Sequence, residues 1–149
     1  MGHFASGVTI MTTTAAGRMH GMTVSAFASQ SLEPLLILVS VERSTVMYRM
    51  VMESRAFAIN ILDEHGEGTA RFFADNARLE TPEFREDAYR IGITGSPILK
   101  EAAAVLEAGI HSTVEAGDHT IIVGQVTALE VLKDAVPLIY YRSGYRRVG

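Results

Sequence analysis

Short runs of β-branched and apolar residues, bounded by turn-forming residues, recur along almost the whole of this chain. Clear examples are LLILVSV at 35–41, AFAINIL at 56–62 and the long run at 120–132. Val, Ile and Thr suit the pleated, half-buried surface of a strand, whereas the intervening Gly, Pro, Asp and Ser suit turns. Roughly six or more strands are expected on this pattern. So many short strands favour a mainly β fold, namely a closed antiparallel barrel with short helical insertions.

The length of 149 residues and the hydrophobic content of 48% are sufficient for one domain with a packed core. We therefore assign residues 1–149 to a single domain. The chain is expected to begin with a turn and a strand at 4–14, and a hairpin turn at 15–18 leads into a β-run at 21–31. The run LLILVSV is continuous enough to predict a strand buried on both faces. A last strand is expected at 137–141, before a basic tail.

Helices are expected in two places. Ser44 or Thr45 can cap a helix, since apolar residues recur at helical spacing from Val46 onward. A second helix is expected at 63–74, with its apolar side chains, among them Ala70 and Phe73, turned inward.

Three further segments carry weaker signals. The highly charged segment 75–90 indicates a surface excursion. The segment 102–112 has a helix-like composition but is also compatible with a strand. Gly124, within the long run at 120–132, indicates a β-bulge or a close approach of the backbone to another part of the chain.

The residues present exclude several classes of chemistry. The chain has no cysteine, which excludes disulfides, cysteine-based zinc sites, iron–sulfur clusters and a cysteine nucleophile. Its five histidines show no paired metal-ligand spacing, and we expect no metal site. The serine-nucleophile elbow, the P-loop and the dinucleotide fingerprint GxGxxG are missing as well.

Charge and hydropathy limit the partners. A formal net charge of −4 argues against nucleic acid or an acidic membrane as the main partner. The first residues, 1–4, show no signal-peptide pattern, and no apolar run approaches the length of a membrane span. We therefore expect a cytoplasmic protein with no nucleic-acid or membrane partner.

The stretch GMTVSAFASQS at 21–31 interleaves small hydroxyl residues with apolar ones. Strand alternation would send Thr23, Ser25 and Phe27 to one face. Hydroxyls beside a backbone with small side chains can hydrogen-bond a flat polar ring without crowding it. The alternative is an ordinary half-buried strand whose Ser and Thr residues face water.

A candidate phosphate corner lies where LLILVSV ends and the first helix begins. Arg43 stands beside the expected helix N-terminus. Free backbone N–H groups, the positive end of the helix and a guanidinium can together hold a phosphate. The alternative is a plain capped helix with Arg43 in solvent.

His119 is the histidine most worth considering for function. It follows the turn residues Gly117 and Asp118 and stands at the mouth of the long β-run. In that position it can donate to a ligand or be oriented by Asp118.

Taken in order, the segments FASGVTIMTT, GMTVSAFASQSLEP, LLILVSVERS, FAINIL, GDHTIIVGQV and PLIYYRSGYRRV resemble the flavin reductase family over nearly the whole chain. The two most specific blocks are GxTxSxF followed by SxSLxP, and GDHxIxVGxV. The resemblance implies the FMN-binding split β-barrel, an antiparallel, Greek-key-like fold. It implies an NAD(P)H:flavin oxidoreductase, in which FMN or FAD receives a hydride from NADH or NADPH. A homodimer and a partner monooxygenase are implied with it.

The resemblance also implies the site residues. His119 would lie near the nicotinamide and the flavin and take the catalytic role. The cofactor-binding set would be Thr23, Val24, Ser25, Ala26, Ser29, Gln30, Ser40, Arg43, Ser44 and Tyr145. Residues 23–26 would lie against the isoalloxazine ring, residues 29–30 near the ring or the ribityl chain, and Tyr145 at the border. The ribityl-phosphate end would be bound by Ser40, Arg43 and Ser44.

The chain departs from the family pattern at Ala26, where a second hydroxyl is usual, at Leu35, where a second Pro is usual, and at Ala108, where Cys is common. Ala26 removes one side-chain contact to the flavin. Two other functions stay open. One is a flavin-binding electron-transfer or sensing protein that uses no NAD(P)H, and the other is a related split barrel acting on a pyridoxamine phosphate or haem.

Overall fold

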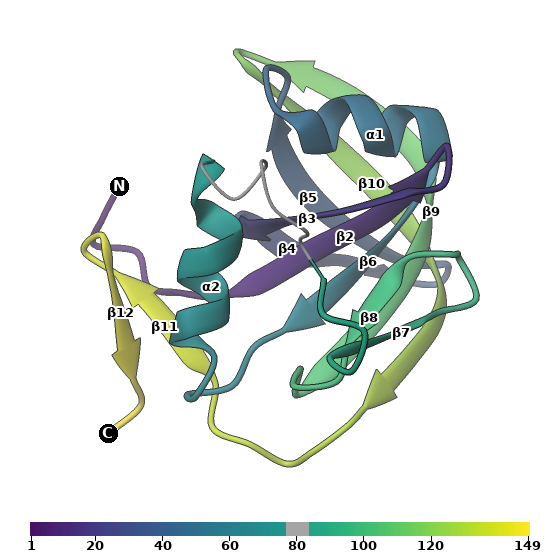
Figure 1. The fold of residues 1–149 in the computed structure, drawn as a ribbon. Coiled ribbons are helices and arrows are strands. Elements are labelled where there is room, and N and C mark those ends of the chain that lie inside the picture. Colours follow the sequence, from purple (N-terminus) through teal and green to yellow (C-terminus); the bar gives the residue numbers. More distant parts are fainter. Residues whose placement is uncertain (77–83) are drawn as a thin grey trace.

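The computed structural model describes residues 1–76 and 84–149 and is built mainly from antiparallel strands (Figure 1). Its main sheet has seven strands in the order β3-β2-β6-β9-β10-β5-β4. In that order they span Arg18–Val24, Thr9–Ala15, Ala56–Ile61, Ala104–Ala116, His119–Val131, Leu35–Glu42 and Phe27–Leu32. Every pairing in this sheet is antiparallel. The mainly β, antiparallel fold expected from the sequence is therefore confirmed.

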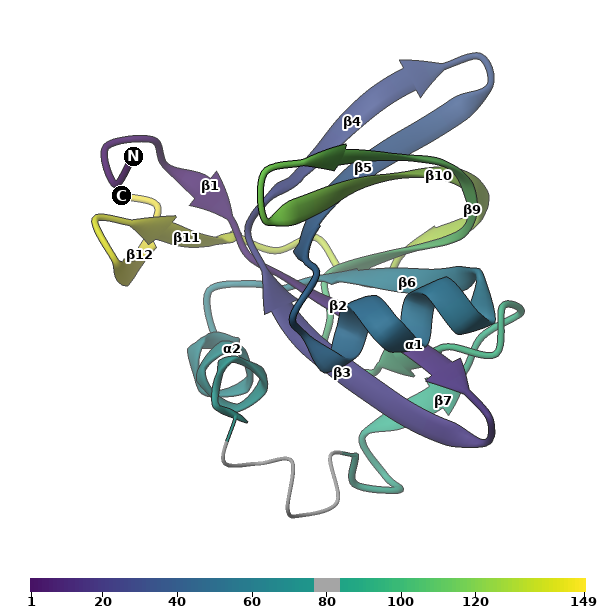
Figure 2. The ribbon, with the colours of Figure 1, turned by 90° about the horizontal axis from the view of Figure 1, so that it is seen from above.

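The two edge strands of this sheet, β3 and β4, are consecutive in the chain. Only Ser25 and Ala26 separate them. The sheet must therefore curve until its two edges approach each other at this link. Figure 2 shows this curvature from above, with α1 lying along the sheet.

Two smaller sheets and two helices complete the fold of the described residues. One sheet has the order β1-β11-β12, with bounds Ser6–Gly7, Leu138–Tyr141 and Gly144–Arg147. The other pairs β7 (Tyr89–Ile91) with β8 (Pro97–Leu99). The helices are α1 (Val46–Ser54) and α2 (Glu67–Ala74), and α2 lies beside β11 and β12 in Figure 1. In the described part of the chain, neither helix is long and apolar enough to cross a membrane.

The single β-run expected at 21–31 is wrong, because the chain turns between β3 and β4. The N–H of Phe27 donates to the carbonyl of Ser25 at 3.0 Å, which closes a tight turn around Ala26. The N–H of Ser40 donates to the carbonyl of Ala26, also at 3.0 Å, and this bond fixes the turn against β5. The side chains of 21–31 therefore do not alternate between two faces along the whole stretch, because the alternation stops at this turn.

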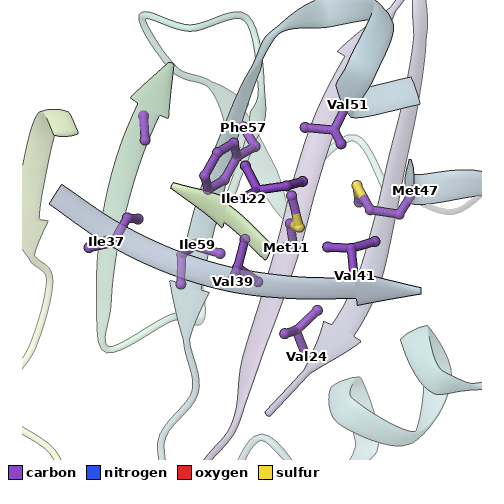
Figure 3. Close-up of a cluster of buried hydrophobic side chains, with 11 residues drawn as sticks. Met11, Val24, Ile37, Val39, Val41, Met47, Val51, Phe57, Ile59 and Ile122 are labelled. Carbon is purple, nitrogen blue, oxygen red and sulfur yellow. The ribbon is translucent and has the colours of Figure 1, made fainter. Parts of the chain in front are cut away.

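The main core fills the concave side of the curved sheet and is covered by one face of α1 (Figure 3). Met47 and Val51 of α1 are fully buried in the same cluster as Val39 and Ile122 of the sheet. Their spacing of one helical turn puts both side chains on one face. The helix begins where the sequence predicts, since the hydroxyl of its N-cap residue Thr45 accepts the N–H of Tyr48 at 3.2 Å.

The strand β5 is buried on one face only, and the expectation of burial on both faces is wrong. Ile37, Val39 and Val41 are buried in the core, whereas the alternate residues Leu36 and Leu38 are partly exposed. An antiparallel sheet can leave one face uncovered, which a continuous apolar run does not reveal. This second face of β5 lines the groove described in the next subsection.

The second helix begins later than expected, at Glu67 rather than at 63. Asp63 instead forms an isolated β-bridge with Pro137, which continues the chain from β6 in extended form. Ala70 and Phe73 are both buried, as the sequence predicts.

The segment 102–112 belongs mostly to the long strand β9 and not to a helix. Gly124 of β10 lies at a shift in the register between β10 and β9. A Cβ at this position would lie 2.7 Å from Cζ of Phe57, closer than real contacts allow. Both the bulge and the close approach expected at Gly124 are therefore confirmed.

Near the C-terminus, the last expected strand is present as β11. The basic tail that follows forms the additional strand β12, which the sequence does not predict. Of the expected surface excursion at 75–90, residues 77–83 lie outside the described residues.

Asp63 carries a buried carboxylate whose ionised form the fold stabilises. Nζ of Lys133 lies 2.7 Å from its Oδ2, and the N–H of His65 donates to its Oδ1 at 2.9 Å. The hydrogen bond from Lys133 lowers the pKa of Asp63 below its ordinary value, against the opposing effect of burial. The folded-state pKa is thus lower than the unfolded one. The resulting stabilisation is complete above the unfolded pKa and is lost as the pH falls through the folded pKa.

We therefore expect the free energy of unfolding to fall more steeply between about pH 6 and about pH 3 in the parent protein than in Asp63→Asn, which cannot titrate. Chemical denaturation at the two pH values measures this difference. The matched control is Asp134→Asn, at an exposed position of the same segment as Lys133, which should keep the parent's pH dependence. An unaltered pH dependence in Asp63→Asn would contradict the assignment.

Candidate functional site

A groove of about 550 Å³ lies on the face of β5 and β10 that points away from the core, next to the turn between β3 and β4. It is lined by Met1, Phe4, Ser6, Ser25, Ala26, Phe27, Ala28, Leu38, Ser40, Ile121 and Tyr140. Its volume falls within the range of about 300–1,000 Å³ that is usual for small-molecule sites. The groove therefore has the size of a ligand site.

The register in which β5 pairs with β10 determines which residues form the floor of the groove. The antiparallel pairing of β5 with β10 places Ser40 opposite Ile121. Because side chains alternate along a strand, Leu38 and Ser40 face the groove while Val39 faces the core. The backbone hydrogen bond from Ser40 to Ala26 then brings the small residues of the β3–β4 turn against this floor.

The chemistry of the groove suits a flat ring with a polar edge. All the lining side chains are uncharged. The walls include the apolar or aromatic residues Phe27, Ile121 and Tyr140, whereas Ser25 and Ser40 supply hydroxyl groups that can donate or accept hydrogen bonds. Small side chains at the turn leave the backbone within reach of a ligand.

The structure divides the residues expected at positions 23–26. Ser25 and Ala26 line the groove. The side chain of Val24 is buried in the main core, so only its backbone can face a ligand. The hydroxyl of Thr23 donates to the carbonyl of Ala70 at 2.6 Å, which ties β3 to the middle of α2.

The other expected cofactor residues are spread more widely. Ser29 and Gln30 are exposed on β4, where the pairing with β5 shifts register, and neither is among the residues that line the groove. Ser44 lines a second hollow of about 360 Å³ at the start of α1. This hollow is also lined by His20, Met22, Glu42, Thr45, Val46 and Asn76.

Tyr145 lies close to the groove without being one of its lining residues. Its ring centroid is 5.4 Å from that of Tyr140, which does line the groove, and the guanidinium of Arg71 lies 5.1 Å from the Tyr145 ring. Burial raises the pKa of the Tyr145 hydroxyl, so the ring is neutral near neutral pH. The expected place of Tyr145 at the border of the site stays a prediction, and its neighbour Tyr140 is the tyrosine that lines the groove.

His119 stands at the start of β10, in the turn that joins it to β9. Its Nδ1 lies 2.7 Å from Oδ1 of Asp118, and the hydrogen bond from His119 lowers the pKa of that carboxyl. Asp118 therefore orients the imidazole, which is one of the two roles expected for this pair. Among the described residues, no group of three His, Asp or Glu side chains is placed to hold a metal ion.

The predicted cofactor-binding set leaves out eight of the eleven residues that line the groove, among them Leu38, Ile121 and Tyr140. Alternation along β5 would identify Leu38 only if one face of the strand were known to be uncovered. Ile121 and Tyr140 reach the groove through pairings between distant parts of the chain, for which the sequence gives no local signal.

Comparison with known proteins gives matches along the whole chain. A family model described as "Flavin reductase like domain" matches residues 1–149. The reductase component of 4-hydroxyphenylacetate 3-monooxygenase from Thermus thermophilus is 32% identical over 148 residues, which cover 99% of this chain and 92% of that protein. A Rhizobium meliloti protein named "Probable flavin reductase" is 39% identical over 145 residues. That match covers 97% of this chain but spans only 45% of the longer relative.

A solved structure agrees with these matches. The NADH:FAD oxidoreductase of Streptomyces globisporus aligns with a TM-score of 0.93 and 32% sequence identity. The alignment covers 99% of this chain and 89% of that one. The similarity in sequence and the similarity in fold therefore extend over the same residues.

Proposed function

The chain belongs to the flavin reductase like domain family, and from this premise we propose that it is an NAD(P)H-dependent flavin reductase. In this reaction a hydride passes from NADH or NADPH to FMN or FAD. The proposal is carried by the uncharged groove formed by the β3–β4 turn and β5, in a chain that the family model matches throughout. It is supported by the names of the relatives, which include an NADH:FAD oxidoreductase.

The residues of the groove fit a flavin ring. Ser25, Ala26 and Ser40 present small side chains, and a large side chain at any of these positions would occupy the space that a ring needs. The hydroxyl groups can hydrogen-bond a polar ring edge, and Phe27 and Ile121 can cover the apolar part. We propose the N-terminus of α1 beside Ser44 as the phosphate contact, while Ser29, Gln30 and Tyr145 stay predictions.

The protein itself has little covalent chemistry to perform. When bound, the flavin supplies the capacity to accept a hydride. The groove residues hold the ring in one orientation and exclude water from its apolar side. Hydroxyl and backbone N–H donors at the β3–β4 turn can stabilise negative charge that develops on the polar edge.

His119 is the catalytic residue of the proposal, and its replacement gives a direct prediction. His119→Ala should slow hydride transfer or weaken nicotinamide binding by about tenfold, roughly 1.4 kcal/mol, while flavin still binds. The reason is that Asp118 holds the imidazole in one orientation. Stopped-flow oxidation of NADH separates the rate from the affinity. His111→Ala, at an exposed histidine of the neighbouring strand β9, is the control. Kinetics equal to the parent's would remove His119 from the mechanism.

Oxidation of NADH and of NADPH, each with riboflavin, FMN and FAD in turn, tests the function as a whole. We expect rapid oxidation that depends on added flavin. Flavin binding without oxidation of either nucleotide would favour the electron-transfer or sensing function instead. A chain that binds no flavin would contradict both functions.

Two partners follow from the proposal. We propose that the reduced flavin serves a monooxygenase, in keeping with the Thermus thermophilus relative named as a reductase component.

We also propose a homodimer, which is supported by the large apolar side chains that the fold leaves exposed, among them Leu32, Val114 and Val131. Sedimentation analysis measures the oligomeric state. The cytoplasmic location and the single-domain organisation stay predictions.

A further inference from the structure

Arg43, which the sequence places at a phosphate corner, is engaged with the turn between β9 and β10. Its Nη1 donates to the carbonyl of His119 at 2.6 Å, and its Nη2 donates to the carbonyl of Gly117. Its backbone N–H donates to the carbonyl of Asp118 at 3.0 Å. One residue therefore binds the backbone carbonyls of all three residues of the GDH turn.

The chain neighbours of Arg43 face a different direction. Glu42 and Ser44 both line the hollow at the start of α1, and the residues that line this hollow do not include Arg43. The guanidinium thus lies away from the helix N-terminus, where a phosphate would bind. Figure 1 shows the link between β5 and α1 beside the turn of the β9–β10 hairpin.

The turn held by Arg43 also carries the side chains of the proposed chemistry. The side chains of His119 and Asp118 are 42% and 81% exposed, so packing does little to fix them. Gly117 adopts a φ of 63°, in the left-handed region that favours glycine, which is a flexible residue. The hydrogen bonds from Arg43 add to the pairing of β10 with β5, in which His119 lies opposite Glu42, and they reach Gly117 and Asp118 before β10 begins.

We propose that Arg43 is a positioning residue for His119 and not a ligand of the flavin phosphate. The inference rests on the proposed function, because it concerns the reaction in which His119 takes part. The planar guanidinium can bridge two carbonyls in a fixed geometry, which a flexible ammonium does not do as well. Loss of these bonds loosens the turn at Gly117 and Asp118 while the strand pairing of β10 remains, and a small displacement of a reacting group is enough to slow a reaction strongly.

Two variants and a double variant test this role. Arg43→Ala should slow hydride transfer by about tenfold and change the Kd values for FMN and for riboflavin by the same factor. Because Arg43 acts through His119, Arg43→Ala combined with His119→Ala should react no more slowly than His119→Ala alone. Arg43→Lys, which keeps the positive charge but loses the planar fork, should bind FMN like the parent and still transfer hydride several times more slowly. The control is Arg49→Ala, at an exposed position of α1, with parent-like rates.

Several results would overturn the proposal. A loss of FMN affinity that exceeds the loss of riboflavin affinity would show that Arg43 binds the phosphate. Rate losses that multiply in the double variant, or an Arg43→Ala variant as fast as the parent, would separate Arg43 from His119. If circular dichroism shows that Arg43→Ala is unfolded, Arg43→Lys carries the same comparison.

A measurement that needs no enzymatic activity tests this inference separately from the proposed function. If the parent oxidises neither NADH nor NADPH, the proposed function fails, but the tie between Arg43 and the turn can still be measured. The NMR signals of the His119 ring should shift in Arg43→Ala and stay at the parent's positions in Arg49→Ala. Unchanged ring signals in both variants would reject the positioning role independently of any activity.

Discussion

Ser40→Trp should weaken flavin binding by about a hundredfold, roughly 2.8 kcal/mol, while the protein stays folded. Ser40 lies on the groove face of β5, and its N–H is already bound to the carbonyl of Ala26. The backbone bond survives the substitution, whereas the indole side chain takes the space between the β3–β4 turn and Ile121. The change therefore fills the proposed ring site without disturbing the core on the opposite face of the strand. Flavin fluorescence quenching measures the Kd.

Two controls show whether Ser40→Trp weakens flavin binding because its side chain fills the groove. Ser40→Ala keeps the space and removes only the hydroxyl, so we expect a loss of tenfold or less, about the value of one hydrogen bond. Ser112→Trp makes the same substitution at an exposed position of β9 outside the groove and should bind flavin like the parent. Parent-like affinity in a folded Ser40→Trp would show that the ring binds elsewhere.

Phe57→Ala should lower the free energy of unfolding by about 3–5 kcal/mol. The Phe57 ring is fully buried in the main core, in the cluster drawn in Figure 3. It lies against the backbone of Gly124, where an added Cβ would be 2.7 Å from its Cζ and 3.0 Å from the Cβ of Ala108. Removal of the ring leaves a cavity that the surrounding strands cannot close completely. Urea denaturation measures the loss.

The contact between Phe57 and Gly124 makes a second, linked expectation. Gly124→Ala alone should cost about 1–3 kcal/mol, because its methyl group overlaps the Phe57 ring. In the Phe57→Ala background this cost should shrink, since the ring is gone and the new methyl group partly fills the cavity. Strictly additive costs in the double variant would contradict the packing described for the core.

The local features of the fold are those that the sequence predicts well. The cap at Thr45, the inward residues of α2 and the special position of Gly124 each depend on near neighbours in the chain or on one residue type. The turn between β3 and β4 is fixed against β5 by a hydrogen bond from Ser40 to Ala26, which are far apart in sequence. Because alternation continues through Ser25 and Ala26 with no Gly or Pro, the break leaves no local signal.

The candidate site likewise combines residues that the sequence identifies with residues that only distant strand pairings bring in. Ser25, Ala26 and Ser40 are predicted and do meet in one groove, whereas Tyr140 enters it through the pairing of β11 with β1. The direction of Arg43 also has no local signal. It follows β5 directly, and only the long β9–β10 hairpin decides which carbonyls its guanidinium meets.

An NMR titration of the ¹⁵N-labelled protein with riboflavin tests the position of the ring most directly. Riboflavin lacks the phosphate, so its contacts report the groove alone. The account predicts saturable shifts of the amide signals of Ser25, Ala26, Ser40 and Ile121. Shifts confined to other regions, such as the hollow beside Ser44, would contradict it.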